Sequence, residues 1–409
     1  MTAALAFRDV DIVFGSGSVR QRRRQHELAL HLLAEGATRN DIAARTGAVV
    51  GVAGASLRVE AGQICVVMGL SGSGKSTLLR AANGLNQVTR GSVLVQDGAG
   101  TVDIARCDAA TLRRVRSERV AMVFQQFALL PWRTVRENVG LGLELRGMPA
   151  TARRRIVDEK LHLVGLEQWG DRYAAELSGG MQQRVGLARA FATDADILLM
   201  DEPFSALDPL IRTKLQDELL ALQAAVKKTI LFVSHDLDEA LKLGNAISIM
   251  EGGRIVQTGT PEDIVLRPAD AYVAEFVQHM NPLNVLRAET VMRPRAALHD
   301  DGASLWLDRE GRYRLTLDAR GAPAAARRAE TALPIHRCAE AGAAAGTLAL
   351  MPVAVPLRAV VQARQASGHP VLLEADGAFA GVCDDAEMLA ALCGIARADP
   401  AEASVAPVR

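Results

Sequence analysis

One glycine-rich segment, Gly69–Thr77 with the sequence GLSGSGKST, constrains the fold more than any other part of the chain. It fits the pattern G-x-x-x-x-G-K-[ST], in which glycines let successive backbone N–H groups surround a phosphate at the start of a helix. Gln63–Met68 is a nearly continuous apolar run, as expected for a strand buried on both faces. Lys75–Ala82 is predicted to be a helix that ends at Asn83-Gly84. These flanks predict an α/β fold with a mostly parallel sheet.

The segment also predicts a site for ATP and Mg²⁺. We expect the Lys75 ammonium to lie between the β- and γ-phosphates and the Ser76 hydroxyl to bind Mg²⁺, while Thr77 contacts the α-phosphate. The predicted nucleotide contacts from this segment are Gly69, Ser71, Gly72, Ser73, Gly74, Lys75, Ser76 and Thr77.

A second predicted strand, Ile197–Met200, is followed by two carboxylates. A carboxylate at the C-terminal end of a parallel strand faces the ligand crevice, so we expect Asp201 to bind Mg²⁺. Glu202 is then placed to orient and polarise the water that attacks the γ-phosphate. An isolated acidic pair of this kind could equally be a solvated surface feature, but its position after a phosphate-binding segment favours catalysis.

The segment Leu177-Ser-Gly-Gly-Met181, followed by Gln182-Gln-Arg184, resembles the signature of ATP-binding-cassette (ABC) ATPases. The resemblance departs from the commonest form at Met181, where Gln is usual. It implies that Ser178, Gly179 and Gly180 cap the γ-phosphate of an ATP held by the other subunit of a homodimer.

The same resemblance implies roles for four further residues. Phe14 would stack on adenine, and Gln125 would sense Mg²⁺ and the transmembrane partner. Asp208 would lie in the loop that crosses the dimer interface, and His235 would contact the γ-phosphate. Catalysis is therefore assigned to Glu202, with Gln125 and His235 beside it.

Composition agrees with this interpretation. Of the 409 residues, 49% are hydrophobic and 23% are charged, and the formal net charge is +0, so no general attraction to nucleic acids is implied. The 5 cysteines form no C-x-x-C pair, which favours reduced thiols in a cytosol. No apolar run reaches the roughly 18–20 residues that cross a bilayer, so a transporter would need separate membrane subunits.

The resemblance thus predicts a peripheral protein on the cytoplasmic face of a bacterial inner membrane. Its partners would be a transmembrane permease and, indirectly, an extracytoplasmic substrate-binding protein. Phe127–Trp132 is expected to form part of the groove that receives the permease, with Trp132 as the contact residue.

An insertion at about residues 20–47 interrupts the predicted N-terminal antiparallel sheet. We expect a helical hairpin, with Thr38 as an N-cap and Gly47 as a stop signal. The segment from Thr38 onward also resembles part of a DNA-binding helix-turn-helix. Its recognition helix would have to be Val49–Ser56, which lacks the basic and amide side chains that read bases, so nucleic acid is not an expected partner.

The insertion, together with Ala206–Arg212 and His235–Ala240, narrows the resemblance to ATPase subunits of quaternary-amine importers. It covers residues 1–284, expected to be the ATP-binding domain with a helical subdomain at about 117–176. Choline is the expected substrate, and glycine betaine or proline is the alternative. A non-transport ABC protein is a further alternative, although tandem cassettes and long coiled coils are missing from the sequence.

The C-terminal region is expected to form a small α+β domain at residues 285–396. His369–Asp385 has the pattern strand, Asp-Gly turn, strand, and resembles half of a cystathionine-β-synthase (CBS)-type regulatory pair. Leu305–Asp308 is assigned to a degenerate first half. Residues 397–409 are expected to be a disordered tail.

Overall fold

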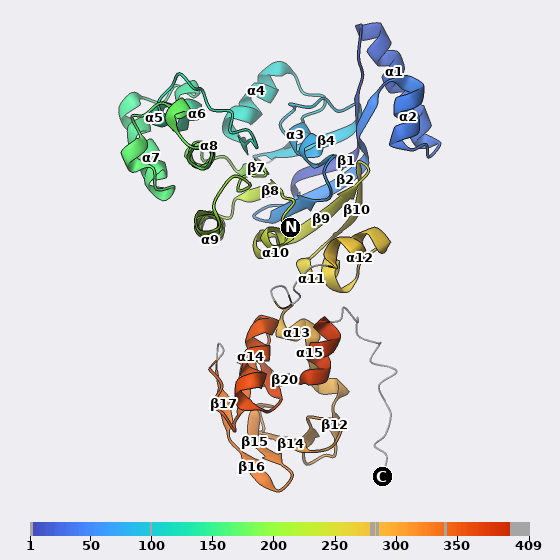
Figure 1. Ribbon diagram of the computed structural model, residues 1–409, viewed down its shortest axis with the longest axis vertical. Coiled ribbons are helices and arrows are strands. Elements are labelled where there is room, and N and C mark those ends of the chain that lie inside the picture. Colours follow the sequence, from blue (N-terminus) through green and yellow to red (C-terminus); the bar gives the residue numbers. More distant parts are fainter. Residues whose placement is uncertain (1–2, 99, 279–282, 284–285, 339–341, 393–409) are drawn as a thin grey trace. The chain divides into compact units, whose positions relative to one another are not determined.

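The computed structural model describes residues 3–392 except residues 99, 279–282, 284–285 and 339–341 (Figure 1). The chain divides into two compact units, Met1–Thr260 and Pro261–Arg409, and each is described by itself. The division lies before the boundary expected at residues 284–285. Helices α11 (Pro261–Leu266) and α12 (Ala271–Val277) therefore belong to the second unit, and Val265 and Leu266 of α11 pack against its core. The expected tail lies outside the described residues.

The first unit begins with a 4-stranded antiparallel sheet of order β2-β1-β4-β5. Its strands are β1 (Ala3–Phe14), β2 (Val49–Glu60), β4 (Arg90–Asp97) and β5 (Gly100–Asp103). The sheet confirms the predicted N-terminal antiparallel sheet. Val49 of β2 pairs with Phe14 of β1. The segment that a DNA recognition helix would need is therefore a strand, and the helix-turn-helix interpretation is wrong.

A 6-stranded sheet of order β10-β9-β3-β8-β7-β6 carries the nucleotide motifs. Its strands are β3 (Ile64–Met68), β6 (Val120–Val123), β7 (Ile197–Asp201), β8 (Thr229–Val233), β9 (Ala246–Glu251) and β10 (Arg254–Gly259). Every neighbouring pair is parallel except β9–β10, which forms a hairpin across Gly252-Gly253. Every residue of β3, β7 and β8 is buried, as their apolar runs predict.

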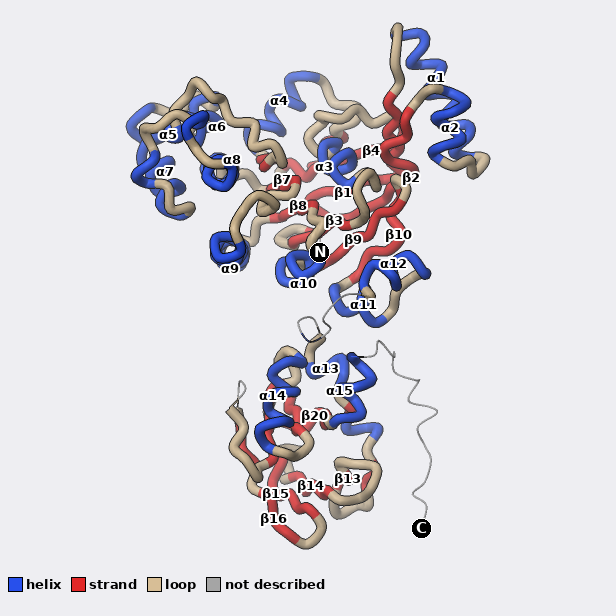
Figure 2. Tube along the Cα trace, viewed as in Figure 1, coloured by secondary structure: helices blue, strands red, loops and turns tan. Residues whose placement is uncertain are grey.

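Helices surround the two sheets (Figure 2). Those of the first unit are α1 (Val19–Ala34), α2 (Arg39–Thr46), α3 (Lys75–Ala81), α4 (Ala109–Glu118), α5 (Val135–Val139), α6 (Leu141–Leu145), α7 (Ala150–Leu163), α8 (Gly179–Ala192), α9 (Pro209–Val226) and α10 (Leu237–Leu243). Of these, α5, α6, α7 and α8 lie together to one side of the sheets (Figure 2). Short 3₁₀ turns, η1 (Glu167–Trp169) and η2 (Ala174–Glu176), precede α8. Strand β6 lies inside the range expected for the helical subdomain but belongs to the sheet, so the helices of that subdomain begin only at Val135.

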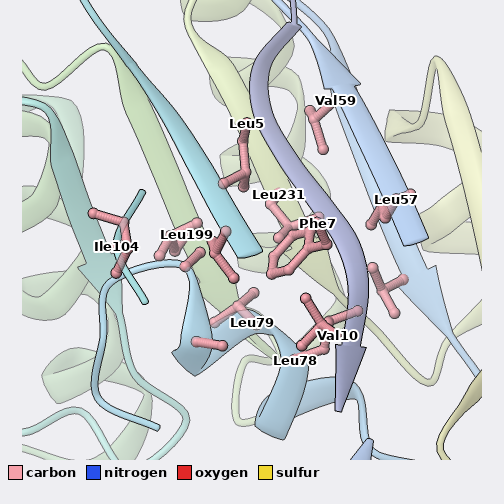
Figure 3. Close-up of a cluster of buried hydrophobic side chains, with 14 of the residues drawn as sticks. Leu5, Phe7, Val10, Leu57, Val59, Leu78, Leu79, Ile104, Leu199 and Leu231 are labelled. Carbon is pink, nitrogen blue, oxygen red and sulfur yellow. The ribbon is translucent and has the colours of Figure 1, made fainter. Parts of the chain in front are cut away.

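A large core lies between the two sheets of the first unit, with α3 inside it (Figure 3). Leu78 and Leu79 of α3 are buried against Phe7 of β1 and against Leu199 and Leu231 of the parallel sheet. This packing fixes the helix that follows the phosphate-binding segment, because both of its neighbouring layers are sheets.

The insertion forms the predicted helical hairpin from α1 and α2. Thr38 caps α2 through a capping box with Asp41, and Gly47 ends the helix with a φ of 68°. Leu32 and Ile42 share a small core with residues of β1 and β2. The hairpin is therefore packed on the strands from which it emerges.

The second unit contains two 5-stranded sheets. The first, of order β11-β20-β19-β18-β17, consists of β11 (Arg293–Pro294), β17 (Ile335–Arg337), β18 (Leu348–Pro352), β19 (Val371–Ala375) and β20 (Ala378–Cys383). The second, of order β12-β13-β14-β15-β16, is antiparallel and consists of β12 (His299–Asp300), β13 (Leu305–Trp306), β14 (Tyr313–Leu317), β15 (Pro323–Arg328) and β16 (Thr331–Leu333). The helices are α13 (Ala288–Val291), α14 (Leu357–Ser367) and α15 (Asp385–Leu392), with a 3₁₀ turn η4 (Arg295–Ala297).

The predicted strand, turn, strand and helix are present as β19, Asp376-Gly377, β20 and α15. With β18 and α14 they form a β-α-β-β-α unit. Leu305–Trp306, which was assigned to a first half, lies instead in the antiparallel sheet β12–β16, and no second β-α-β-β-α unit surrounds it among the described residues. The two sheets share a core that includes Leu315 and Leu350.

Candidate nucleotide site

The phosphate-binding segment forms a tight loop between β3 and α3. Gly69 and Gly74 have φ of 141° and 106°, and a Cβ at these positions would lie 2.1 Å from the Met250 carbonyl oxygen and 2.4 Å from the Gly51 carbonyl oxygen, respectively. The Gly253 N–H also donates to the Ser73 carbonyl at 2.9 Å. Glycine is therefore required at both positions, and the β9–β10 hairpin supports one side of the loop.

Lys75 folds back over this loop. Its ammonium donates to the carbonyl oxygens of Gly69 at 2.8 Å and Leu70 at 3.0 Å. Burial lowers the pKa of Lys75, while the nearby carboxylates of Glu202 and Asp201 act in the opposite direction. The ammonium can exchange the two carbonyls for phosphate oxygens without leaving the loop.

Asp201 lies at the end of β7 and is fully buried. Its Oδ1 accepts a hydrogen bond from the Ser76 hydroxyl at 2.7 Å, and its Oδ2 accepts one from the Arg80 guanidinium at 2.9 Å. The predicted Mg²⁺ ligands Ser76 and Asp201 are thus in contact, and hydroxyl and carboxylate oxygens suit this hard cation. Arg80 was missed by the sequence reasoning, although it follows Ser76 by one helical turn on α3 and so lies on the same face.

Glu202 brings the predicted catalytic residues together. Its Oε2 accepts a hydrogen bond from the Gln125 amide at 3.2 Å and lies 3.2 Å from Nδ1 of His235. Glu202 itself has a φ of 48°, and its N–H donates to the Val233 carbonyl at 3.0 Å. The three residues follow β6, β7 and β8, which are neighbours in the sheet, so their side chains meet at its C-terminal edge.

A buried carboxylate supports the loop that carries His235. Glu239 accepts hydrogen bonds from the Ser234 hydroxyl at 2.5 Å and from the Gln216 amide at 3.1 Å. Burial raises the pKa of Glu239, and these hydrogen bonds oppose that rise. Nothing in the local sequence distinguishes Glu239 from a surface residue of a helix, because its partners come from other elements.

The signature segment begins α8. Ser178 is the N-cap and accepts from the Met181 N–H at 3.4 Å, so Gly179 and Gly180 form the first helical turn. Among the described contacts, none joins Ser178, Gly179 or Gly180 to the phosphate-binding loop of the same chain. This arrangement agrees with a signature that acts on a second copy.

Gln183 connects the signature helix to the catalytic loop. It is buried, donates to the Glu202 carbonyl at 3.2 Å and accepts from the Ala206 N–H at 3.2 Å. Asp208, two residues after Ala206, caps α9 by accepting a hydrogen bond from the Ile211 N–H at 3.0 Å. Gln183 was not among the predicted site residues, since its role depends on contacts across the fold.

Phe14 ends β1 with an exposed ring, as an adenine-stacking residue requires. A Cβ on Gly51 would lie 2.8 Å from Cε2 of Phe14 and 2.9 Å from Cγ2 of Thr77. The ring therefore lies beside the start of α3, on the edge of the phosphate-binding loop.

The segment after Gln125 leads to an exposed aromatic residue. Phe127 and Ala128 have φ of 57° and 47°, and their carbonyls accept hydrogen bonds from Arg189 at 2.8 and 2.7 Å. The Trp132 side chain is 71% exposed, which agrees with a predicted contact residue rather than a core residue. Among the described residues, no helix is both long and apolar enough to cross a bilayer.

Comparison with known proteins identifies the family to which the chain belongs. A family model described as ABC transporter matches residues 52–205. The glycine betaine/proline betaine transport system ATP-binding protein ProV of Escherichia coli (strain K12) is 51% identical over 265 residues, which cover 65% of each chain. The glycine betaine/carnitine transport ATP-binding protein GbuA of Listeria monocytogenes is 50% identical over 283 residues, 69% of this chain and 70% of that protein.

A solved structure shows the same fold. The ATP-binding cassette MJ0796, in a dimeric post-hydrolysis state bound to ADP and Pi, matches with a TM-score of 0.53 and 28% identity. The match covers 63% of this chain and 98% of that one. The chain matches only 65% of the length of its first relatives, but its match to GbuA extends over 70% of that protein. The chain therefore belongs to the ABC transporter family of ATP-binding proteins.

Proposed function

We propose that the protein is the ATPase subunit of a binding-protein-dependent importer that couples ATP hydrolysis to the uptake of a quaternary amine. The observation that carries this proposal is the convergence of Gln125 and His235 on one carboxylate oxygen of Glu202, at 3.2 Å each. A carboxylate held in this way can accept a proton from a water molecule beside the γ-phosphate.

The neighbouring residues fit the remaining requirements of hydrolysis. Ser76 and Asp201 would hold Mg²⁺, which neutralises charge on the phosphate oxygens, and the Gln125 amide oxygen would complete the set of protein ligands. Lys75 would bind the β- and γ-phosphates, and Phe14 would stack on the adenine.

The active form would be a homodimer. Among the described contacts, none joins Ser178, Gly179 or Gly180 to the phosphate-binding loop of the same chain, so the signature of one copy would close the ATP site of its partner. The dimeric MJ0796 structure supports this arrangement. Closure and reopening around two ATP molecules would then move the permease between its inward-facing and outward-facing states.

The substrate is best described as a betaine. The sequence analysis expected choline, whereas ProV and GbuA are named for glycine betaine together with proline betaine or carnitine. Identity of 50% or more over the ATP-binding region supports the same class of solute here. We therefore propose glycine betaine, with choline as the alternative outcome.

The test is uptake of labelled glycine betaine and choline by cells that lack this subunit. Restoration of glycine betaine uptake by the native chain, but not by Glu202→Gln, is expected. Glu202→Gln should still bind ATP, because it keeps the shape of the side chain and removes only the basic oxygen. The matched control is Glu159→Gln, because Glu159 is a surface carboxylate that pairs with Lys160 outside the site. Restoration of choline alone would change the substrate assignment, and restoration of neither would favour a non-transport ABC protein.

We further propose that Trp132 contacts the permease at the cytoplasmic face of the membrane. Trp132→Ala should abolish uptake while the ATPase activity of the purified protein persists. Trp169, also exposed on the helical subdomain, provides the control, and Trp169→Ala should leave uptake intact. Equal loss of uptake in both variants would contradict a specific contact at Trp132.

The second unit is proposed to be a regulatory domain. Its β-α-β-β-α unit, formed by β18, α14, β19, β20 and α15, supports this role. Because α11 and α12 belong to this unit, the informative truncation ends the chain at Thr260 rather than near residue 285. Uptake that stays unchanged at every external osmolarity after this truncation would refute a role in sensing ionic strength.

A further inference from the structure

The helical insertion reaches the phosphate-binding loop through one side chain. Arg39, the first residue of α2, donates from Nη1 to the Gly72 carbonyl oxygen at 3.0 Å. No ion pair with a carboxylate is found for Arg39 among the described residues. A guanidinium, which stays charged at any physiological pH, is therefore held against the loop that is expected to bind phosphates.

The position of Arg39 is fixed by the packing of the insertion. Leu32 of α1 and Ile42 of α2 are buried together with Val13 of β1 and Val50 of β2. The Thr38 capping box sets the first turn of α2, where Arg39 lies. These strands belong to the sheet that covers α3, so the insertion is anchored on the layer next to the helix that follows the phosphate-binding loop.

Gly72 is the part of the loop that needs such support. A Cβ on Gly72 would meet nothing within 4 Å, whereas Cβ atoms on Gly69 and Gly74 would meet backbone oxygens within 2.4 Å. Gly72 also has a φ of 77°, a conformation that costs glycine little but that no packing contact selects. On this open side of the loop, the Arg39 hydrogen bond replaces the missing contacts.

We propose that Arg39 is a positioning residue for the phosphates of the bound nucleotide, and that the insertion serves to hold it there. By donating to the Gly72 carbonyl, Arg39 polarises the peptide between Gly72 and Ser73, which makes the Ser73 N–H a stronger donor; this N–H now donates to the Leu70 carbonyl at 3.2 Å and would turn to a phosphate oxygen. The guanidinium also adds a fixed positive charge beside an anion site. This inference rests on the proposed function, because it assumes that the loop binds a nucleotide.

The test compares nucleotide binding by three variants of the full chain. The probes are MgADP and a fluorescent ATP analogue, and kcat and KM for ATP are measured on the same preparations. Arg39→Ala should weaken binding of both probes and raise KM by about five- to tenfold, within the range of one ordinary hydrogen bond because Arg39 acts on the phosphates only through the loop, with kcat within about twofold. Arg39→Lys, which keeps the charge and one donor, should restore most of the affinity.

Arg45→Ala is the matched control, because Arg45 lies on the same helix, is exposed and carries the same charge. It should bind both probes like the native chain. Native affinity in Arg39→Ala overturns the inference. The inference is also overturned if Arg39→Ala loses affinity together with a fall in Tm and Arg39→Lys restores neither, since a residue with a purely structural role would behave in that way. If the native chain binds neither probe, the proposed function itself is refuted.

Discussion

Removing the Arg80 guanidinium should destabilise the first unit by leaving a buried charge without its cation. Asp201 is fully buried, and its Oδ2 accepts the Arg80 hydrogen bond at 2.9 Å. Breaking a buried ion pair by deleting one partner costs about 3–5 kcal/mol. The Arg80 side chain is 40% exposed, so water screens part of this interaction, and the Ser76 hydroxyl still donates to Asp201. For Arg80→Ala we therefore expect a loss of about 2 kcal/mol in the free energy of unfolding.

The assay is urea unfolding followed by tryptophan fluorescence. Trp132 and Trp169 lie in the first unit and Trp306 in the second, so a Trp306→Phe background confines the signal to the unit of interest. Arg23→Ala is the control, because the Arg23–Glu27 pair is exposed and should contribute less than about 0.5 kcal/mol. If Arg80→Ala is no less stable than Arg23→Ala, the Arg80 guanidinium does not compensate the buried charge of Asp201, and the reasoning fails.

Three further predictions concern burial and close packing. Because burial raises the pKa of Glu239, the native state binds the Glu239 proton more tightly than the unfolded chain does. The free energy of unfolding, relative to that of Glu239→Gln, should therefore fall as the pH rises above 4.5, the ordinary pKa of a glutamate. Parallel pH profiles of the unfolding free energy in the two proteins would contradict this. Burial also raises the pKa of Cys65 to about 12, so a thiol reagent at neutral pH should label the half-exposed Cys107 and spare Cys65 in the folded chain. Mass spectrometry of the peptides should show Cys65 labelled only after the chain is unfolded. Gly51→Ala would place a methyl group 2.8 Å from Cε2 of Phe14 and 2.9 Å from Cγ2 of Thr77, so both predicted nucleotide contacts must shift and ATP affinity should fall several-fold; unaltered affinity would argue against stacking of Phe14 on adenine.

Local sequence was sufficient for those parts of the fold that depend on neighbouring residues. The apolar runs at β3, β7 and β8 identify buried strands, and Thr38 and Gly47 delimit α2 through capping chemistry. The site residues that lie at strand ends, such as Glu202, follow from the same reasoning, because parallel strands present their C-terminal ends at one edge.

The residues that were missed act through contacts between distant elements. Arg80, Gln183 and Glu239 lie on helices where a charged or amide side chain usually faces water, and only the packed structure shows that each is paired with the catalytic strands. The antiparallel strands β12–β16 were missed for a different reason. β12 and β13 have two residues each, and β15 and β16 carry mostly exposed alanine, arginine and threonine residues, so only β14 shows clear hydrophobic alternation.

The place of β3 in the sheet also bears on when a nucleotide can first be bound during folding. β3 lies between β8 and β9, and the backbone N–H of Ile64 donates to the side chain of Asn245, 181 residues further along the chain. The loop after β3 rests on the Met250 carbonyl and on Gly253, which come later still. Contacts of such long sequence separation form slowly, because loop closure must precede them. A growing chain therefore carries its phosphate-binding sequence long before it has a phosphate-binding loop, and nucleotide should bind only after the β9–β10 hairpin has joined the sheet.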